Sequence, residues 1–276
     1  MIFVEGVITA RKNPTVMYAS SLQNKKSREE YSAFIAEGIK LFCEAARANL
    51  PIESVLVCED KKDVIYPIIE EYLDKDIYSR TKVYTLADTC FEKVSTEKSP
   101  QGVIVIIKSL DFFKSCNKII EETFINKEDK KKTIALFEMR DPGNLGAVVR
   151  SAVAFGAERI ILSEGCADVY NPKTIRAAMG SIFKVEILIS DDMFRTVSAL
   201  RNSGRRVYAA ELRENAVSLD DIEVTKNDVV IIGNEGHGIP EALSGECDNS
   251  VYIPISENAE SLNAAVAAAI FMREQK

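Results

Sequence analysis

The second half of the chain alternates short apolar runs with helical patterns or longer connections. Six such runs occur after residue 132. Short buried strands that alternate with helices predict a parallel sheet covered on both faces. The predicted strands are residues 134–137, 160–162, 185–189, 207–210, 229–232 and 251–255. Ligands of such sheets bind beyond the carboxyl ends of the strands, so the loops that follow the strands are the candidate sites.

The first part of the chain mixes helix and strand patterns in a smaller α/β unit. Residues 27–50 carry Ile35, Ile39 and Phe42 at helical spacing, which predicts one long amphipathic helix ended by Pro51. Short β-rich runs predict three strands. These runs are residues 55–58, 83–86 and 103–107.

A polar, lysine-rich stretch separates the two patterns. The predicted organisation is a domain at 1–110, a helix and linker at 111–132, and a second domain at 133–276. The chain is 46% hydrophobic and 28% charged, the balance of a soluble globular protein. The longest apolar run, residues 264–272, is too short to span a bilayer. Glu5 stands where a signal peptide requires apolar residues, so we expect a cytoplasmic protein.

Cysteine and histidine usage argues against a metal centre and a hydrolase triad. The six cysteines form no Cys-x-x-Cys pair, which predicts reduced and mostly buried thiols and no metal site. A Ser-His-Asp triad would have to use His237, the one histidine, and no Gly-x-Ser-x-Gly motif accompanies it.

The charge distribution is acidic overall and basic near the N-terminus. A net charge of −7 does not indicate a nucleic-acid-binding surface. Residues 6–27 nevertheless contain four basic residues and no acid. Such a run is usually a solvated face, and it is also a candidate for phosphate contact. The candidate contacts are Arg11, Lys12, Lys25, Lys26 and the following Arg28, with a second basic run at 127 and 130–132.

The loop after the first strand of the second domain joins a glycine turn to a predicted helix at 147–155. Asn144 lies at the start of this helix and Arg150 lies about two turns into it. In one interpretation Asn144 caps the helix and Arg150 is a surface charge. In the other, both residues belong to an anion site at the helix N-terminus. In the second case Arg150 is a bidentate phosphate ligand.

Two later loops are further candidates. Gly233, Gly236 and Gly238 let the backbone approach a ligand closely, although the loop has neither a Walker A nor a Gly-x-Gly-x-x-Gly pattern. Glu235 in this loop is either a solvated acid or an anchor for backbone N–H groups or for an asparagine of another loop. Ser261 is predicted to cap the last helix, which is apolar all round and must be buried in the domain or in a subunit interface.

Taken together, these loops resemble the SpoU (TrmH-type) RNA ribose 2′-O-methyltransferases of the SPOUT superfamily. The resemblance covers residues 134–274, and three motifs in the same order and at the same spacing make it highly specific. The matching motifs are residues 141–152, 233–238 and 253–263, with 171–181 between them. The N-terminal part resembles the ribosomal-protein-like substrate-binding domain often fused to this enzyme, with marks at Asn13, Pro14 and residues 99–102.

The resemblance implies a fold, a cofactor and an assembly. The expected fold is a parallel-sheet α/β domain with a deep trefoil knot, a rare exception to unknotted chains, plus the small α/β substrate-binding domain. S-adenosylmethionine would sit bent in the knot, held largely by backbone, and two copies of the chain would form a homodimer. The cofactor positions implied are Gly233, Glu235, Gly236, Ile253, Ser261 and Leu262.

The expected activity is methyl transfer to a ribose 2′-hydroxyl in structured RNA, with rRNA favoured over tRNA. Arg150 would contact the RNA phosphate and the 2′-hydroxyl, and Asn144 and Asn263 would position the hydroxyl and Arg150. Ser261 and Glu235 would hold the loops. The alternatives are tRNA as the substrate, a role in antibiotic resistance, and a catalytically silent RNA-binding protein of the same fold. A nicotinamide-nucleotide enzyme is disfavoured because the first strand lacks the dinucleotide fingerprint.

Overall fold

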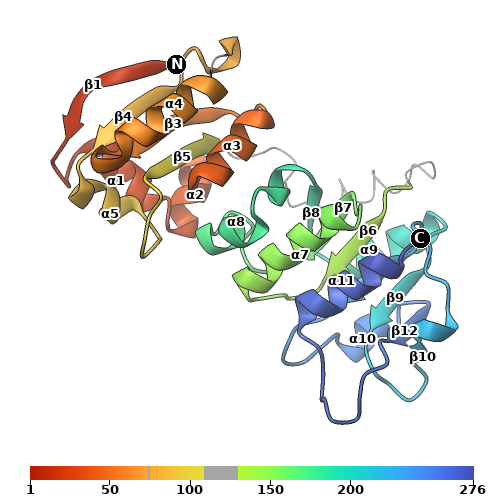
Figure 1. The fold of residues 1–276 in the computed structure, drawn as a ribbon. Helices are drawn as coiled ribbons and strands as arrows, with labels where there is room; N and C mark the ends of the chain where they lie inside the picture. The colour runs from red at the N-terminus through yellow and green to blue at the C-terminus, as the bar shows by residue number, and fades with distance from the viewer. Residues whose placement is uncertain (74, 109–129) are drawn as a thin grey trace. The chain divides into compact units, whose positions relative to one another are not determined.

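The computed structural model describes residues 1–73, 75–108 and 130–276 of the chain. Its contacts divide the chain into two compact units, Met1–Leu110 with Asp168–Phe183, and Asp111–Ala167 with Lys184–Lys276 (Figure 1). Most of the predicted linker 111–132, including Lys127, lies outside the described residues. Within the described ranges, none of the helices combines the length and the apolar character that crossing a bilayer requires.

The first unit is built on a mixed five-stranded sheet in the order β1-β4-β3-β5-β2. Its strands are β1 (Ile2–Ile8), β2 (Ala33–Glu37), β3 (Ile52–Cys58), β4 (Lys82–Leu86) and β5 (Val103–Lys108). Its helices are α1 (Pro14–Ser21), α2 (Lys25–Tyr31), α3 (Ile39–Arg47), α4 (Lys62–Tyr72), α5 (Asp88–Val94) and α8 (Pro172–Ala178). Short 3-10 helices lie at Glu59–Lys61, Asp76–Tyr78 and Ser181–Phe183. The three strands predicted in this region are confirmed as parts of β3, β4 and β5.

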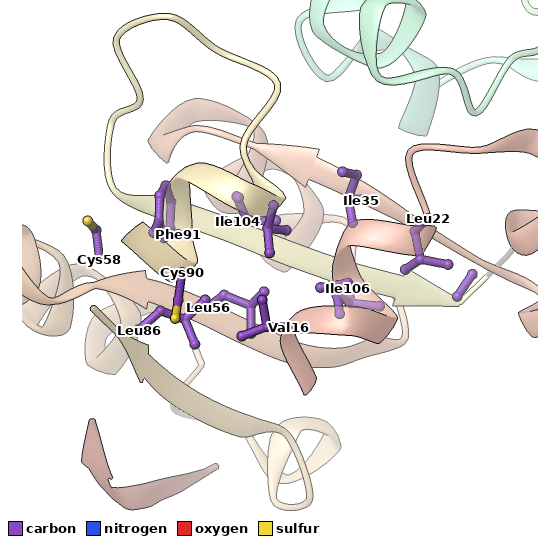
Figure 2. Packing of buried hydrophobic residues seen from close by; sticks show 13 residues of the cluster. Val16, Leu22, Ile35, Leu56, Cys58, Leu86, Cys90, Phe91, Ile104 and Ile106 are labelled. Carbon is purple, nitrogen blue, oxygen red and sulfur yellow. The ribbon is translucent and has the colours of Figure 1, made fainter. Parts of the chain in front are cut away.

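The core on one face of this sheet joins two helices to the central strands. Val16 of α1 and Phe91 of α5 are fully buried against Leu56, Ile104 and Ile106 (Figure 2). Because strand side chains alternate between faces, these strand residues present a continuous apolar surface to the helices.

The single long helix predicted over residues 27–50 is wrong. Helix α2 ends at Tyr31, its cap Ser32 adopts a left-handed φ of 47°, and β2 follows. Residues 33–36 of β2 are buried and pair antiparallel with β5, so sheet pairing overrides the helical spacing of their apolar side chains. Gly38, at a φ of 108°, then turns the chain into α3, a backbone angle that only glycine adopts readily.

The second unit contains a seven-stranded sheet in the order β10-β12-β9-β11-β6-β7-β8, and every strand pair is parallel, which confirms the predicted parallel sheet. Its strands are β6 (Thr133–Leu136), β7 (Arg159–Ser163), β8 (Glu186–Ser190), β9 (Val207–Ala210), β10 (Val217–Ser218), β11 (Val229–Ile232) and β12 (Asn249–Tyr252). Its helices are α7 (Pro142–Ala154), α9 (Met193–Asn202), α10 (Glu241–Ser244) and α11 (Ala264–Glu274), with a 3-10 helix at Leu219–Asp221. Among the strands of this second sheet, only the two-residue β10 was not predicted from the apolar pattern.

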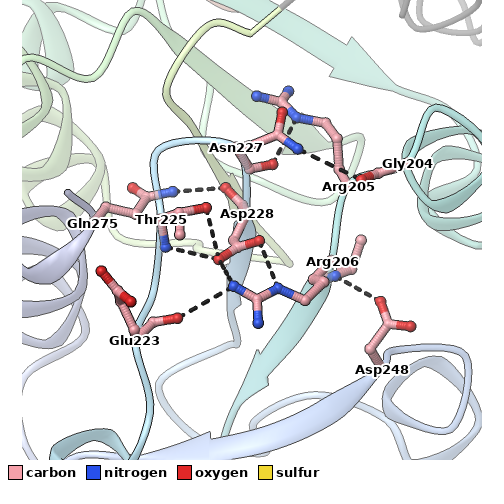
Figure 3. Close-up of polar contacts among 10 residues, drawn as sticks. Gly204, Arg205, Arg206, Glu223, Thr225, Asn227, Asp228, Asp248 and Gln275 are labelled. Atoms are coloured by element: carbon pink, nitrogen blue, oxygen red, sulfur yellow. Dashed lines mark hydrogen bonds and ion pairs between the residues drawn. The ribbon is translucent and has the colours of Figure 1, made fainter.

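A buried polar network fixes the C-terminal end of α11 against the sheet. Gln275 donates from Nε2 to the carbonyl oxygens of Thr133 (3.0 Å) and Asp228 (2.8 Å). The Asp228 carboxylate, 2% exposed as a residue, accepts hydrogen bonds from Arg206 and from the backbone of Thr225 (Figure 3). Buried polar groups are stable only when paired in this way. The network therefore holds the helix whose opposite end carries Asn263.

Candidate active site

The loop after β6 enters α7 earlier than the sequence predicts. The helix begins at Pro142, and Asp141 is its cap, with Oδ1 accepting a hydrogen bond from the backbone N–H of Asn144 at 2.8 Å. Proline in the first turn costs nothing there, because that N–H has no helical partner. The interpretation of Asn144 as the helix cap is therefore wrong, and its side chain is available for other contacts.

Asn144 connects the two later loops. Its Nδ2 donates to Oε1 of Glu235 at 2.9 Å, and its Oδ1 accepts a hydrogen bond from Nδ2 of Asn263 at 3.0 Å. The partners lie 91 and 119 residues further along the chain. The structure therefore brings three of the five predicted catalytic residues together, and Glu235 is the partner of an asparagine from another loop rather than only a solvated acid.

The cap of α11 is Asn263, and the prediction of Ser261 at this position is wrong. Oδ1 of Asn263 accepts hydrogen bonds from the backbone N–H groups of Ala265 (2.9 Å) and Val266 (3.3 Å). The same side chain thus caps the helix with its oxygen and holds Asn144 with its nitrogen. Ser261 is exposed two residues before the cap.

The loop after β11 folds back on itself around Gly233. A Cβ atom at Gly233 would lie 2.6 Å from the carbonyl carbon of Gly238 and 2.8 Å from the backbone nitrogen of Ile239, so only glycine fits. Asn234 makes an Asx turn, accepting from the backbone N–H of Gly236 at 2.8 Å. This arrangement exposes Glu235 and Gly236 at the tip of the loop.

Glu138 and Asn234 are site residues that the sequence reasoning missed. Asn234 donates from Nδ2 to the carbonyl oxygen of Glu138 at 2.7 Å, which ties the loop after β11 to the loop after β6. Glu138 adopts a left-handed φ of 48°, and its carboxylate lies 3.5 Å from Nε2 of His237. A positive φ outside glycine is uncommon and marks a backbone that its surroundings hold in place. No feature of the sequence around Glu138 signals this conformation.

Arg150 lies on α7 with an exposed side chain. Its guanidinium makes no hydrogen bond or ion pair with any residue that the structure describes. An arginine held on a helix with no internal partner presents its full fork of donors to an external anion. The structure does not bring Arg150 into contact with the other candidate residues.

The loop between β12 and α11 has the features of a backbone binding site. Ile253 and Leu262 are half-buried and Ser261 is exposed. In residues 253–262 of the described chain, backbone–backbone hydrogen bonding outside the sheet is limited to a turn in which the N–H of Ala259 donates to the carbonyl oxygen of Ser256. The N–H groups of Ser261 and Leu262 thus have no protein acceptor among the described residues. Together with the close approach at Gly233, these open peptide groups fit a ligand that is held mainly by main-chain contacts.

The predicted phosphate contacts in the first unit divide into two groups. Arg11, Lys12, Lys25 and Lys26 are exposed, and Lys25 forms only a loose helical pair with Glu29 at 3.8 Å. Arg28 is 4% exposed, and its guanidinium donates hydrogen bonds to the Asp168 carboxylate and to two backbone carbonyl oxygens. The prediction that Arg28 contacts a phosphate is therefore wrong, because the side chain has a structural role.

One group of side chains in the first unit resembles a metal-binding arrangement. Cys58, Asp60 and Asp88 place a thiol and two carboxylates within 4.8 Å of one another. The absence of a metal site, which the cysteine spacing predicts, stays a prediction.

The comparisons with known proteins place this geometry in a family. The family model described as SpoU rRNA Methylase matches residues 131–273, and the MRM3-like substrate binding domain matches residues 13–105. The chain belongs to the SpoU rRNA methylase family. Membership implies the trefoil knot and the α/β fold class expected from the sequence.

Particular relatives are similar over nearly the whole chain. The 23S rRNA (guanosine(2553)-2′-O)-methyltransferase RlmP of Bacillus subtilis is 30% identical, over 96% of this chain and 97% of its own. The 23S rRNA (uridine(2479)-2′-O)-methyltransferase of Streptomyces viridochromogenes is 27% identical, over 97% and 90%. The crystal structure of an AdoMet-bound rRNA methyltransferase from Sinorhizobium meliloti matches with a TM-score of 0.79 and 28% identity, over 98% and 96%.

Proposed function

We propose that this protein transfers a methyl group from S-adenosylmethionine to a ribose 2′-hydroxyl of ribosomal RNA. The single observation that carries the proposal is the bridge from Asn144 to both Glu235 and Asn263, which joins three motifs from distant parts of the chain. The names of the two relatives support the reaction and favour rRNA over tRNA.

The loops after β11 and β12 would hold the cofactor. The AdoMet-bound relative supports this assignment, and the open peptide groups of Ser261 and Leu262 fit it. When bound, the sulfonium would supply an already activated methyl group. The residues that would hold the cofactor are Gly233, Glu235, Gly236, Ile253, Ser261 and Leu262.

The protein would have to align the ribose 2′-hydroxyl with the methyl group and help one proton leave the hydroxyl. Holding two reactants in attack geometry can supply roughly 7–11 kcal/mol of a barrier. The coupled side chains of Asn144, Glu235 and Asn263 would give the site one fixed arrangement, and Asn144 and Asn263 would position the hydroxyl. Ser261 would support the same loop.

Arg150 would act as a cation rather than as a base. A guanidinium keeps its proton in proteins, and a neighbouring phosphate stabilises the charged form further. We therefore assign Arg150 to the RNA phosphate and to the oxygen that gains negative charge as the hydroxyl proton leaves. The proton would pass to a phosphate oxygen or to water.

The two parts of the chain would divide the work. In this proposal residues 1–110 bind the RNA, 111–132 link the parts, and 133–276 carry out the transfer. The exposed Arg11, Lys12, Lys25 and Lys26 would contribute phosphate contacts, which give affinity without reading sequence. An rRNA substrate also supports the expected cytoplasmic location.

A second copy of the chain would cover the groove between α7 and α11. The groove has a volume of about 360 Å³ and is lined mainly by apolar side chains, among them Ala147, Val266 and Ile270. Val266 is 48% exposed and Phe155 is 39% exposed, whereas an all-apolar helix is expected to be buried. This exposure supports the predicted homodimer, which sedimentation of the purified protein would test.

The function is tested by mapping 2′-O-methyl sites on total RNA from cells with and without the gene. The proposal predicts one rRNA site that disappears with the gene. Loss of a tRNA site instead would identify the alternative substrate. An unchanged map, together with no S-adenosylmethionine binding by calorimetry, would identify a silent RNA-binding protein.

A further inference from the structure

A second hollow of about 430 Å³ lies entirely within the first unit, at the start of β3 and β4 and beside α1. Two tyrosines, Tyr18 and Tyr84, contribute to its lining. Each is partly buried against the apolar core. Tyr84 is two positions from Lys82 on β4, so both side chains leave the same face of the sheet. Rigid aromatic side chains of this kind are platforms on which nucleobases stack.

The hollow also carries unpaired positive charge. Arg80 and Lys82 line it, both are exposed, and neither forms an ion pair with a residue that the structure describes. Arg11 and Lys12 precede the lining residue Pro14 by only a few positions. This concentration of cations stands out in a chain whose net charge is −7, and it would attract a phosphate.

A carboxylate in the same hollow is suited to reading a base. Oε2 of Glu53 accepts a hydrogen bond from the hydroxyl of Tyr18 at 3.2 Å and forms an ion pair with Nζ of Lys108 at 2.6 Å. Oε1 accepts no hydrogen bond from any described residue. Burial and the charge of Glu53 raise the pKa of Tyr18 to about 12, so its hydroxyl stays a donor and holds the carboxylate in position.

We propose that this hollow binds one unstacked nucleotide of single-stranded RNA. The base lies against Tyr18 and Tyr84, with an N–H of its edge donating to Glu53, and the phosphate contacts Arg80 and Lys82. Stacking of splayed-out bases on aromatic side chains and hydrogen bonding to their edges is the usual mode of sequence-specific RNA recognition. The inference rests on the proposed function and adds a second RNA contact distinct from the methyl-transfer site.

The first test measures binding of a ten-nucleotide single-stranded RNA of mixed sequence to the full chain as a function of salt. Tyr84→Leu should weaken binding by about tenfold with an unchanged salt dependence, because a stack is lost. Lys82→Gln should weaken binding because one phosphate contact is lost. The slope of the logarithm of the binding constant against the logarithm of the salt concentration should become shallower by about one or less. The matched controls, Tyr72→Leu and Lys40→Gln, lie outside the hollow and should bind as the wild type does.

The decisive variant is Glu53→Gln. If Glu53 accepts from a base, the variant binds RNA several-fold more weakly although it removes a negative charge. If the hollow attracts RNA by charge alone, the variant binds equally or more tightly, and base reading is overturned. Wild-type affinity in Lys82→Gln, which changes an exposed side chain, would overturn the site as a whole.

Two further measurements separate this inference from other outcomes. Guanosine monophosphate alone should bind more weakly than the ten-nucleotide RNA, and tighter binding of the monophosphate would identify a free-nucleotide site instead. S-adenosylmethionine binding should be the same in all of these variants. A wild-type protein that binds the RNA through the hollow but transfers no methyl group would contradict the proposed function and leave this inference intact.

Discussion

Asn263 donates a hydrogen bond from Nδ2 to Oδ1 of Asn144 at 3.0 Å, across 119 residues of sequence. The amide of Asn144 is thereby oriented, because its Nδ2 must then face the Glu235 carboxylate, which it contacts at 2.9 Å. Asn263 also caps α11 with its oxygen. One side chain thus couples the start of the last helix to the start of α7.

Conservative variants of these two asparagines should separate positioning from stability. Asn263→Asp keeps the capping oxygen but loses the donor to Asn144, so we expect near wild-type stability and about 10- to 100-fold slower methyl transfer. Asn263→Ala should also lose about 1 kcal/mol of stability with the cap. Single-turnover kinetics and thermal unfolding measure the two effects. Wild-type turnover in Asn263→Asp would remove the bridge from the mechanism.

Removal of the Arg150 guanidinium should abolish transfer without affecting the cofactor. Arg150→Ala is expected to show no methylation and nearly intact S-adenosylmethionine binding by calorimetry. Arg150→Lys should also fail, because an ammonium cannot make the bidentate contact. Loss of cofactor binding in Arg150→Ala would show instead that this arginine shapes the cofactor loops. Near wild-type turnover of Arg150→Lys would exclude a bidentate contact between the guanidinium and the phosphate.

Gly233 should tolerate no side chain. In Gly233→Ala the new Cβ would clash with the backbone of Gly238 and Ile239, so the loop must shift. We expect a loss of more than about 1 kcal/mol of stability, from the overpacking of a tight site, and strongly weakened cofactor binding. Gly236→Ala is the matched control for folding, because its Cβ meets only the side chain of Asn234, at 3.4 Å. Equal stability of the two variants would contradict this account.

The Cys58 thiol should make stability depend on alkaline pH. Burial and then hydrogen bonding to Asp60 and Asp88 raise the pKa of Cys58 to about 12, from 9.0. Because the folded pKa is raised, the contribution of the neutral thiol to stability is complete below pH 9 and is lost as the pH rises towards 12. Urea unfolding from pH 8 to pH 11 should therefore show wild-type stability falling relative to Cys58→Ser. If the free energies of unfolding of the two proteins change in parallel with pH, the raised pKa of Cys58 is contradicted.

The apolar runs were sufficient to predict the parallel sheet, because buried strands in such sheets must be apolar on both faces. They failed at β2, where Ile35 belongs to a strand although its spacing from Ile39 and Phe42 is helical. The pairing of β2 with β5 joins residues that lie 67 to 75 positions apart, such as Glu37 with Ile104 and Ala33 with Lys108. Local periodicity contains no information about it. The left-handed angles at Ser32 and Gly38 mark the boundaries only once the structure is known.

The site shows the same division between local and distant information. The motifs located Asn144, Glu235 and Asn263, but they did not show which residue caps each helix. Asp141 and Asn263, rather than Asn144 and Ser261, satisfy the first N–H groups of α7 and α11. The burial of Arg28 was equally hidden, because its partner Asp168 lies 140 residues away. A run of exposed charges and a buried ion pair look alike in sequence.

The most direct test of the account is methyl transfer by the purified protein to unmodified 23S rRNA in the presence of S-adenosylmethionine, followed by mass spectrometry of the nucleosides. We expect a single 2′-O-methylnucleoside that is formed by the wild type and is missing with Arg150→Ala. A base-methylated nucleoside, or a 2′-O-methyl product that forms equally well without the Arg150 guanidinium, would contradict the account.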